Sequence, residues 1–199
     1  MTDPAPERAL ATIARELAER GRRYALVGGL AVSVRAEVRF TRDVDVAVVV
    51  TDDADAEQLV FELRQSGYSA VASVEHETQH RLSTVRLLGG DGIKVDLLFA
   101  SSGIEREIVD GATPVEIASA GFVPVASAEE LVAMKVLSMT DLRLQDRLDA
   151  QRLLQLVPDL NLVRIRADLQ RIAERGFDRG QDLTSKLDSL LRAVGMQAG

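Results

Sequence analysis

The sequence predicts an α+β fold in which a mixed sheet, flanked by helices, is followed by a C-terminal helical region. Two observations predict the sheet: short apolar runs alternate with segments of helical spacing, and a GGDG turn at residues 89–92 joins two strand-like segments. A third observation predicts the helical region, because every segment after residue 126 has helical spacing. We therefore expect a core at residues 1–126 and a helical region at residues 127–199.

The elements of the first part follow from apolar spacing and from residues that begin or end helices. Apolar positions 10, 13, 14 and 17 have helical spacing before Gly21, and a valine-rich run predicts a buried strand. Asp52 and Asp55 offer N-cap side chains for the next helix, which Gly67 ends. The expected elements are a helix at 6–20, a strand at 24–27, a helix from Gly28 to about Arg35, a strand at 44–50, a helix at 55–66, β-like residues 68–74, strands at 83–88 and 93–100, a short helix at 103–110 and two extended pieces within 113–125.

The second part begins with a helix-start motif. Ser127 and Glu130 match a capping box, in which each side chain satisfies a backbone N–H in the first helical turn. Helices are expected at about 128–139, 144–156, 161–175 and 180–194. The third and fourth of these helices each have an apolar stripe at helical spacing.

The composition excludes several classes of protein. Of the 199 residues, 46% are hydrophobic but only 4% are aromatic, so the core must consist of Leu, Val, Ile and Ala. The absence of cysteine excludes disulfides and cysteine-based metal sites. The net charge of −7 disfavours broad, non-specific binding of nucleic acid, although a local basic site is compatible with it. We find neither a secretory signal nor an apolar stretch of the roughly 20 residues that a membrane span needs, so a soluble, cytoplasmic protein is expected.

Two aspartates, Asp43 and Asp45, begin the most apolar predicted strand. Side chains two residues apart on a strand point to the same face, about 7 Å apart at the backbone, and two carboxylates so placed repel each other unless a cation lies between them. Asp96 is a third charge inside an apolar run, in the strand after the GGDG turn. If the two strands are neighbours, three oxygen ligands converge, which suits Mg²⁺ (or Mn²⁺) completed by phosphate oxygens and water. The alternative is solvated charges at strand ends, paired with Arg39 or Arg42.

A glycine pair, Gly28-Gly29, joins the first predicted strand to a helix. Glycine lets the backbone approach a ligand closely, and the free N–H groups of the first helical turn attract anions such as phosphate. For an isolated glycine pair, a tight turn without a ligand is the alternative. The Asp-x-Asp segment in the next strand favours the phosphate-binding interpretation.

Together these segments resemble the DNA polymerase β-like nucleotidyltransferase superfamily, and more closely the AbiEii/AbiGii type of bacterial nucleotidyltransferase toxin. The resemblance covers about residues 20–157 and rests on Gly28-Gly29, on Arg39-Phe-Thr41-Arg-Asp43-Val-Asp45 and on Lys94-Val-Asp96. It implies an α/β-type nucleotidyltransferase fold and Mg²⁺-dependent transfer of a nucleoside monophosphate from an NTP to an acceptor. The superfamily more often has Gly-Ser, whereas Gly29 offers only its backbone to phosphate.

The resemblance also implies roles for individual residues. Asp43, Asp45 and Asp96 would hold the metal, and Asp96 would help to deprotonate the acceptor hydroxyl. Gly28 and Gly29 would cradle the phosphates.

Lys135 lies in a helix that is otherwise mostly apolar. By helix geometry alone its side chain either extends to solvent or points into a site; the resemblance favours the site, where a lysine contacts the β or γ phosphate. Arg39 is a second candidate for that contact, and Thr41 is expected to shape its loop and to reach a phosphate. Asp146 and Asp149 share one face of the following helix. The resemblance places Asp146 in the cleft, and a charged helix face paired with neighbouring arginines is the alternative.

Residues 76–80, HETQH, match the H-E-x-x-H pattern of zinc metalloproteases and include both histidines, His76 and His80. That motif needs a long helix to place both imidazoles on one face. The flanking segments are β-rich, so a polar connection between two strands is expected instead.

The acceptor and the biological role follow from the resemblance. It implies a toxin that modifies RNA, with tRNA as the expected acceptor, and a cognate antitoxin protein as partner. An acidic protein would gather RNA through local arginines; the candidates are Arg143, Arg147 and Arg152 beside the cleft and Arg164, Arg166 and Arg171 on the next helix. Two alternatives are a transferase for a cationic drug such as an aminoglycoside or lincosamide, which the acidic charge suits equally well, and a non-catalytic nucleotide-binding module, against which the three carboxylates argue.

Overall fold

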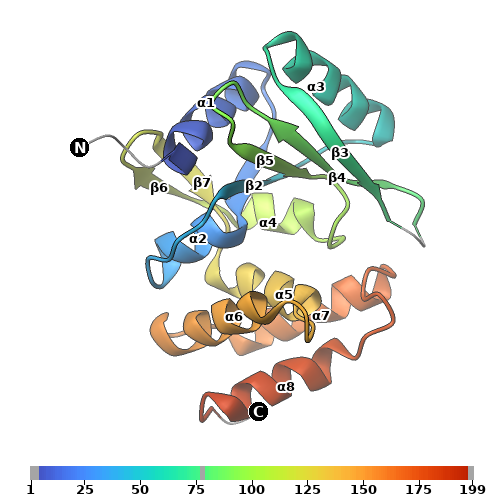
Figure 1. Cartoon of the computed structure of the whole chain (residues 1–199). Helices are drawn as coiled ribbons and strands as arrows, with labels where there is room; N and C mark the ends of the chain where they lie inside the picture. Colours follow the sequence, from blue (N-terminus) through green and yellow to red (C-terminus); the bar gives the residue numbers. More distant parts are fainter. Residues whose placement is uncertain (1–4, 77–78, 197–199) are drawn as a thin grey trace.

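A computed structural model describes residues 5–76 and 79–196 (Figure 1). In this part of the chain the strands are β1 (Tyr24–Val27), β2 (Asp43–Val48), β3 (Ser69–Glu75), β4 (Leu82–Leu88), β5 (Lys94–Leu98), β6 (Thr113–Ile117) and β7 (Gly121–Val125). The helices are α1 (Ala5–Glu19), α2 (Gly28–Arg35), α3 (Asp53–Gln65), α4 (Glu105–Gly111), α5 (Ala128–Ser138), α6 (Leu144–Leu156), α7 (Leu162–Glu174) and α8 (Leu183–Ala193).

The strands form one mixed sheet in the order β3-β4-β5-β2-β1-β7-β6. Strand β2 pairs parallel with β5 and antiparallel with β1, and β1 pairs parallel with β7. The GGDG turn joins β4 and β5 into an antiparallel hairpin, as the sequence predicts. The predicted α+β fold with a mixed sheet is therefore confirmed.

The helices lie in two groups. Figure 1 shows α1 and α3 along the upper side of the sheet, and α2 and α4 between the sheet and the helices α5 to α8 of the lower half. Helix α2 contacts both α5 and α6, so it connects the sheet to the helical region. None of the described helices is long and apolar enough to cross a membrane.

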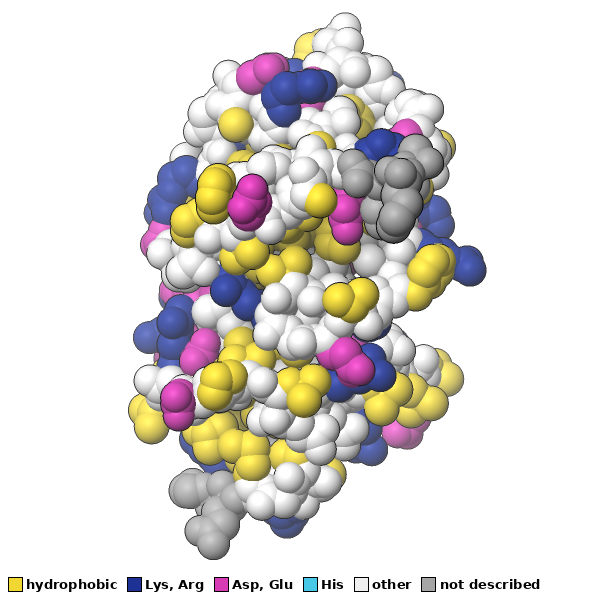
Figure 2. Space-filling view, turned by 90° about the vertical axis from the view of Figure 1, so that its left-hand side faces the viewer, with side chains coloured by type: hydrophobic (Ala, Val, Ile, Leu, Met, Phe, Trp, Pro, Cys, Tyr) yellow, Lys and Arg dark blue, Asp and Glu magenta, His cyan; other side chains and the backbone are white. Residues whose placement is uncertain are grey.

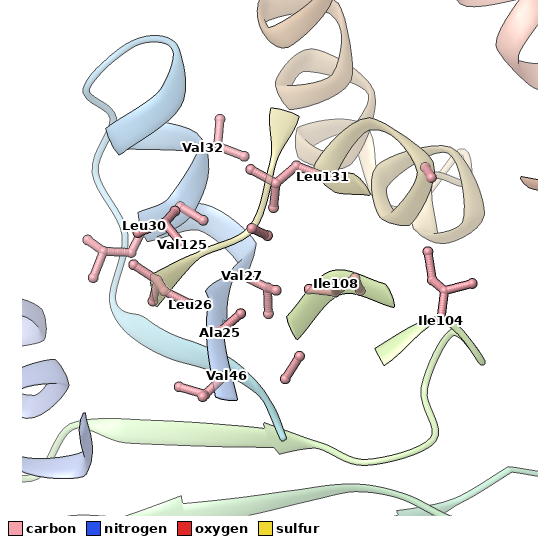
Figure 3. Packing of buried hydrophobic residues seen from close by; sticks show 14 of the residues in the cluster. Ala25, Leu26, Val27, Leu30, Val32, Val46, Ile104, Ile108, Val125 and Leu131 are labelled. Carbon is pink, nitrogen blue, oxygen red and sulfur yellow. The ribbon is translucent and has the colours of Figure 1, made fainter. Parts of the chain in front are cut away.

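The core extends from the sheet into the C-terminal helices. Figure 3 shows Leu26 and Val27 of β1, Val46 of β2 and Leu131 of α5, which belong to one cluster and whose side chains are all completely buried. Full burial of such a side chain contributes roughly 1.5–3 kcal/mol to stability. Because buried side chains from both parts belong to one cluster, the division of the chain at residue 126 stays a prediction.

Most predicted boundaries agree with the structure to within about two residues, and two differences have a local cause. Strand β2 already begins at Asp43, because its ladder with β5 starts at the pair of Asp43 and Lys94. Helix α8 begins at Leu183 instead of residue 180, because the side chain of Asp182 accepts a hydrogen bond from the N–H of Ser185 and caps the helix there.

Candidate active site

The three predicted aspartates come from two adjacent strands. Asp43 and Asp45 lie two residues apart on β2 and therefore point to one face of the sheet. In the parallel pairing with β5, Asp45 lies opposite Asp96. The strand adjacency that the metal hypothesis needs is therefore present in the backbone.

The glycine pair forms the first turn of α2 directly beside Asp45. Gly28 has a φ of +64°, a left-handed conformation that strains any residue with a side chain. A Cβ atom on Gly28 would also collide with the carboxylate of Asp45, and one on Gly29 would collide with the guanidinium of Arg39. The N–H of Gly29 donates a hydrogen bond to the Asp45 carboxylate. Glycine is therefore required at both positions, and the N-terminal end of α2 lies against the Asp45 carboxylate.

Asp45 is held in an environment that disfavours its charge. Burial, together with the nearby carboxylates of Asp96 and Asp43, raises the pKa of Asp45 to about 6, although Lys135 and the N–H of Gly29 act to lower it. Excess negative charge of this kind is what a bound divalent cation would relieve. The donor set of carboxylate oxygens also suits Mg²⁺ or Mn²⁺.

Arg86 of β4 holds the third carboxylate. Its Nε lies 2.8 Å from Oδ1 of Asp96 and its Nη2 lies 2.6 Å from Oδ2, a bidentate pair. In this structure the Asp96 carboxylate is therefore turned toward Arg86, and the expectation that Asp43, Asp45 and Asp96 hold one metal ion stays a prediction. Within residues 5–76 and 79–196, no three His, Asp or Glu side chains are arranged to hold a metal ion.

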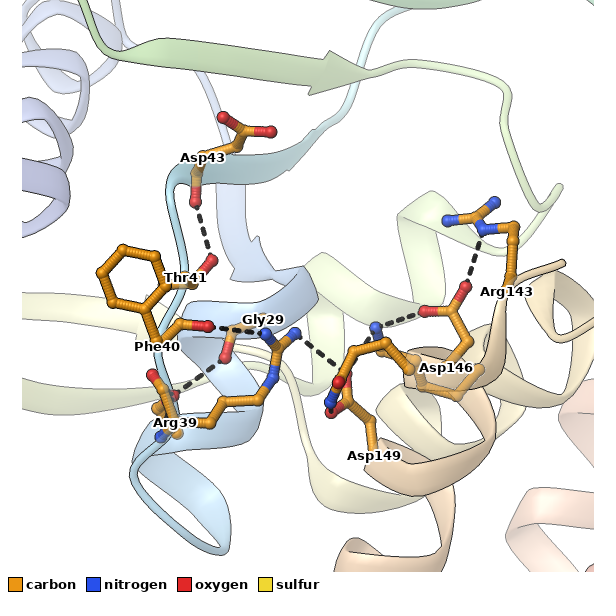
Figure 4. A network of polar contacts seen from close by, with 11 residues as sticks. Gly29, Arg39, Phe40, Thr41, Asp43, Arg143, Asp146 and Asp149 are labelled. Carbon is orange, nitrogen blue, oxygen red and sulfur yellow. Dashed lines mark hydrogen bonds and ion pairs between the residues drawn. The ribbon is translucent and has the colours of Figure 1, made fainter.

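Lys135 of α5 points into the protein and not toward solvent. The residue is 9% exposed, and its Nζ lies 2.7 Å from Oδ1 of Asp146 and 2.9 Å from Oδ2 of Asp149, both on α6. Arg143 completes this network, with its Nε 2.8 Å from Oδ2 of Asp146 (Figure 4). Extension of Lys135 to solvent is therefore excluded, and Asp146 and Asp149 do not form an ordinary exposed charged face.

The loop between α2 and β2 is fastened to α6 by Arg39. Figure 4 shows Arg39 reaching across to Asp149, with Nη2 2.9 Å from Oδ2, while Nη1 donates to the carbonyl of Phe40 at 3.1 Å. Asp149 is completely buried, so this ion pair is shielded from water. Thr41 donates a hydrogen bond to the carbonyl of Asp43 at 3.4 Å, consistent with its expected role in shaping the loop.

These groups line one cleft with two lobes. The larger lobe, of about 790 Å³, extends from Gly28 past the ends of β3 and β4 to the loop between α7 and α8. The smaller lobe, of about 570 Å³, is bounded by the loop before β2 and by the start of α6. Figure 2 shows the surface hollowed on its right-hand edge, between the sheet and the lower helices. The residues common to both lobes are Asp45, Arg86, Asp96, Lys135, Arg143 and Asp146.

Sequence reasoning missed Arg86 and underestimated Asp149. A signal for Arg86 was present, because a hairpin closed at residues 89–92 places residue 86 opposite residue 96, where opposite charges attract each other. Asp149 accepts hydrogen bonds from Arg39 and Gln145 and pairs with Lys135. No local sequence pattern could have identified Asp149 as the partner of Arg39, since the two residues are 110 positions apart in the sequence.

The arginines that were expected to bind RNA differ in whether they line the cleft. Of the six, Arg143 alone is among the residues that line the two lobes. Arg152 pairs with Glu37 beside α6. The three arginines on α7 are paired with acidic residues and line neither lobe: Arg164 with Glu130, Arg166 with Asp188 and Arg171 with Asp168. The α7 arginines are therefore poorly placed for an acceptor in the cleft.

The HETQH segment is a connection between β3 and β4 in its described residues, as expected. Residues 77 and 78 lie outside the described residues. The N–H of His76 bonds to the carbonyl of Arg81, and His80 has a φ of +48°, which a helix does not allow. His76 and His80 are therefore not presented on one helical face as the zinc motif requires.

Solved structures define the class of this fold. An antigenic nucleotidyltransferase-like protein from Paracoccidioides brasiliensis matches with a TM-score of 0.50 and 18% identity, over 94% of this chain and 92% of that one. The structure of ANT(2'')-Ia in complex with adenylyl-2''-tobramycin matches with a TM-score of 0.52 and 13% identity, over 86% of this chain and 99% of that one. The fold is that of nucleotidyltransferases.

The chain belongs to the AbiEii family, whose model, described as "Nucleotidyl transferase AbiEii toxin, Type IV TA system", matches residues 8–196. The resemblance inferred from the sequence motifs is thereby confirmed, and it extends beyond residues 20–157. The protein is a nucleotidyltransferase. No curated protein sequence matches the chain.

Proposed function

We propose that this nucleotidyltransferase moves a nucleoside monophosphate from an NTP to an RNA acceptor, with Mg²⁺ or Mn²⁺, as the toxin of a toxin–antitoxin pair. The observation that supports this most is the juxtaposition of Asp45 with Asp96 across two strands and with the first turn of α2. Carboxylates for a metal and N–H groups for a phosphate are then within one cleft.

In this proposal Asp43 and Asp45 bind the metal. Asp96 becomes the third ligand when its carboxylate is released from Arg86. The raised pKa of Asp45 and the oxygen-only donor set fit a divalent cation. When bound, the metal would polarise the α-phosphate and offset the charge of the leaving pyrophosphate.

The residues around the metal position the triphosphate. In this proposal the N–H groups of Gly28 and Gly29 cradle phosphate oxygens at the start of α2. Lys135 neutralises the β or γ phosphate, and Asp146 holds its ammonium group at the junction of the two lobes. Arg39 lies against Gly29 and is the second cation at this end of α2. Thr41 keeps the intervening loop in place.

The reaction forms one bond and breaks another at the α-phosphorus. The acceptor hydroxyl oxygen attacks this phosphorus, the bond to the bridging oxygen of the β-phosphate breaks, and pyrophosphate leaves with the electron pair. The hydroxyl proton passes to the carboxylate of Asp96, which in this structure is oriented by its two hydrogen bonds from Arg86.

An RNA acceptor has to bind an acidic protein through a local basic surface. Arg143 lines both lobes and lies on the same side of α6 as the Lys135 network. Arg147 and Arg152 follow on α6 and extend the candidate surface away from the cleft. A cationic aminoglycoside is the second candidate acceptor, because the net charge of −7 favours it.

The reaction is tested by incubating the protein with each labelled NTP, Mg²⁺ and either total tRNA or an aminoglycoside panel. Label transferred to tRNA supports the proposal, and label transferred only to a drug assigns the protein to resistance chemistry. Absence of transfer to either, with folded protein and with Mg²⁺ and Mn²⁺, contradicts it.

Variants separate the proposed roles. Asp43→Asn should abolish most metal-dependent NTP binding in calorimetry, whereas Asp110→Asn, a surface carboxylate on α4, should not. Asp96→Asn should bind NTP but lose transfer.

Lys135→Ala should raise the KM for NTP more than it lowers kcat. A folded Lys135→Ala protein with unchanged kinetics would show that Lys135 serves only to neutralise Asp146 and Asp149.

A further inference from the structure

Phe40 is an aromatic side chain displayed at the active-site cleft without a packing partner in the core. It is 79% exposed although phenylalanine is among the more apolar residues, and it lines the smaller lobe together with Asp43 and Asp45. An exposed aromatic ring costs little by itself, but at the edge of a polar cleft it offers a planar contact that polar neighbours do not.

The ring is held in place by its neighbours. Arg39, on one side of it, is tied to the buried Asp149 and donates to the carbonyl of Phe40 itself. The backbone N–H and carbonyl of Arg39 both bond to the hydroxyl of Ser33 on α2. The backbone at Phe40 is therefore fixed from two elements, α2 and α6, so the exposure of the ring is not that of a loose loop.

Arg42 adds a positive charge to the ring. Its guanidinium carbon lies 5.5 Å from the centroid of the Phe40 ring, within the range of a cation–π contact. Arg42 forms no ion pair with the described carboxylates and lines the same lobe. An aromatic plane beside an unpaired arginine is the combination with which proteins bind nucleobases and their phosphates without reading sequence.

We propose that Phe40 and Arg42 form a stacking platform for a nucleobase at the smaller lobe of the cleft. The proposal rests on the proposed function, since it supplies the base whose phosphates react at Asp43 and Asp45. The base belongs either to the donor NTP or to the RNA acceptor beside its reacting hydroxyl. A drug acceptor without an aromatic base does not use the platform.

The sequence contains no tryptophan, so Phe40→Trp creates a single fluorescent probe at the platform. Stacking of a base on this indole should quench its fluorescence. The ligands to be titrated are the four NTPs, inorganic tripolyphosphate and a short single-stranded RNA, all without turnover. Quenching by NTP but not by tripolyphosphate assigns the platform to the donor base. Quenching by RNA alone assigns it to the acceptor base. No quenching by any base-containing ligand overturns the proposal.

Kinetic variants then test the platform in the native sequence. Phe40→Ala should weaken binding of the base-containing substrate by roughly 5- to 100-fold, as expected for loss of one base stack. Phe40→Tyr should restore binding, and Phe40→Leu should not, because leucine is apolar but cannot stack. The matched control is Phe122→Ala, which removes a ring that is 73% exposed on β7 and lines neither lobe.

Two further results would contradict the platform. One is an effect of Phe40→Ala no larger than that of Phe122→Ala, and the other is full rescue by Phe40→Leu. Failure of the proposed function is distinguishable, because it appears as absent transfer in the wild type, whereas failure of the platform leaves wild-type transfer intact.

Discussion

At the scale of single residues, Asp45 shows a conflict between its proposed role in metal binding and the stability of the fold. Its carboxylate lies beside two others and is partly excluded from water, and its pKa is raised to about 6. The folded state therefore binds a proton at Asp45 more tightly than the unfolded chain does. The stability associated with this group is present below about pH 4 and is lost as the pH rises through about 6.

Substitution of Asp45 should therefore stabilise the metal-free protein at neutral pH. Asp45→Asn removes the unfavourable charge, so we expect its free energy of unfolding at pH 7 to exceed that of the wild type by about 1–3 kcal/mol. At pH 4 the difference should almost vanish. Urea denaturation with EDTA from pH 4 to pH 7 measures this, with Asp110→Asn as the control for loss of a charge. If the difference in free energy of unfolding between Asp45→Asn and the wild type did not change with pH, the charge of Asp45 would not destabilise the folded protein.

The pair of Arg86 and Asp96 should contribute measurably to stability. Asp96 is 8% exposed, so Arg86→Gln leaves a largely buried carboxylate without its partner, at a cost of about 1–3 kcal/mol. Asp96→Asn in the same protein should recover most of that loss. The surface pair of Arg81 and Asp53 provides the control, and Arg81→Gln should cost less than about 1 kcal/mol. If the effects of Arg86→Gln and Asp96→Asn on the free energy of unfolding were additive in a double-mutant cycle, direct coupling of the two residues would be excluded.

At the scale of elements, the start of α2 depends on Gly28. Gly21 and Gly28 both have a φ of +64°, but a Cβ atom on Gly21 meets nothing within 4 Å, whereas one on Gly28 collides with Asp45. Gly21→Ala should therefore cost only the backbone strain, about 1–2 kcal/mol. Gly28→Ala should cost more and should also abolish metal-dependent NTP binding. Chemical denaturation measures the stability of the two variants, and calorimetry measures their binding of NTP. If both variants lost the same stability and bound NTP equally well, the turn at α2 would not be part of the binding site.

Helix α5 illustrates how an element directs one side chain, that of Lys135, into the candidate site. The capping box of Ser127 and Glu130 fixes where the helix begins, and both of its hydrogen bonds are present in the structure. Leu131, one turn before Lys135, is completely buried, so the face on which Lys135 lies is directed inward. The burial of the helix thus determines the direction of the lysine.

At the scale of the whole molecule, the proposed toxin role predicts an effect on a bacterial host. Induced wild-type protein should arrest growth, and Asp45→Asn, which loses a proposed metal ligand, should not. Asp110→Asn is the matched control and should arrest growth like the wild type. Growth curves after induction, with equal protein levels on immunoblots, measure this. Harmless wild-type protein that transfers label to a drug in vitro would favour resistance chemistry and leave the transfer reaction unchanged.

Several features could be predicted from the sequence because their causes are local. The hairpin of β4 and β5 follows from the GGDG turn, and the start of α5 follows from the capping box. The two-residue spacing of Asp43 and Asp45 on a strand is sufficient to place both on one face. The motif resemblance then linked these local features to the nucleotidyltransferase family, which the family model confirms.

The sequence by itself determined the elements, the family and the residues that carry charge into apolar strands. Only the tertiary structure decided that β5 lies beside β2, that Asp96 is held by Arg86, and that Lys135 and Arg39 meet at Asp149. The physical reason is distance along the chain. Capping, turn geometry and strand alternation act over a few residues, whereas the pairing of strands and the direction of buried charges depend on the combined packing of segments up to 110 residues apart.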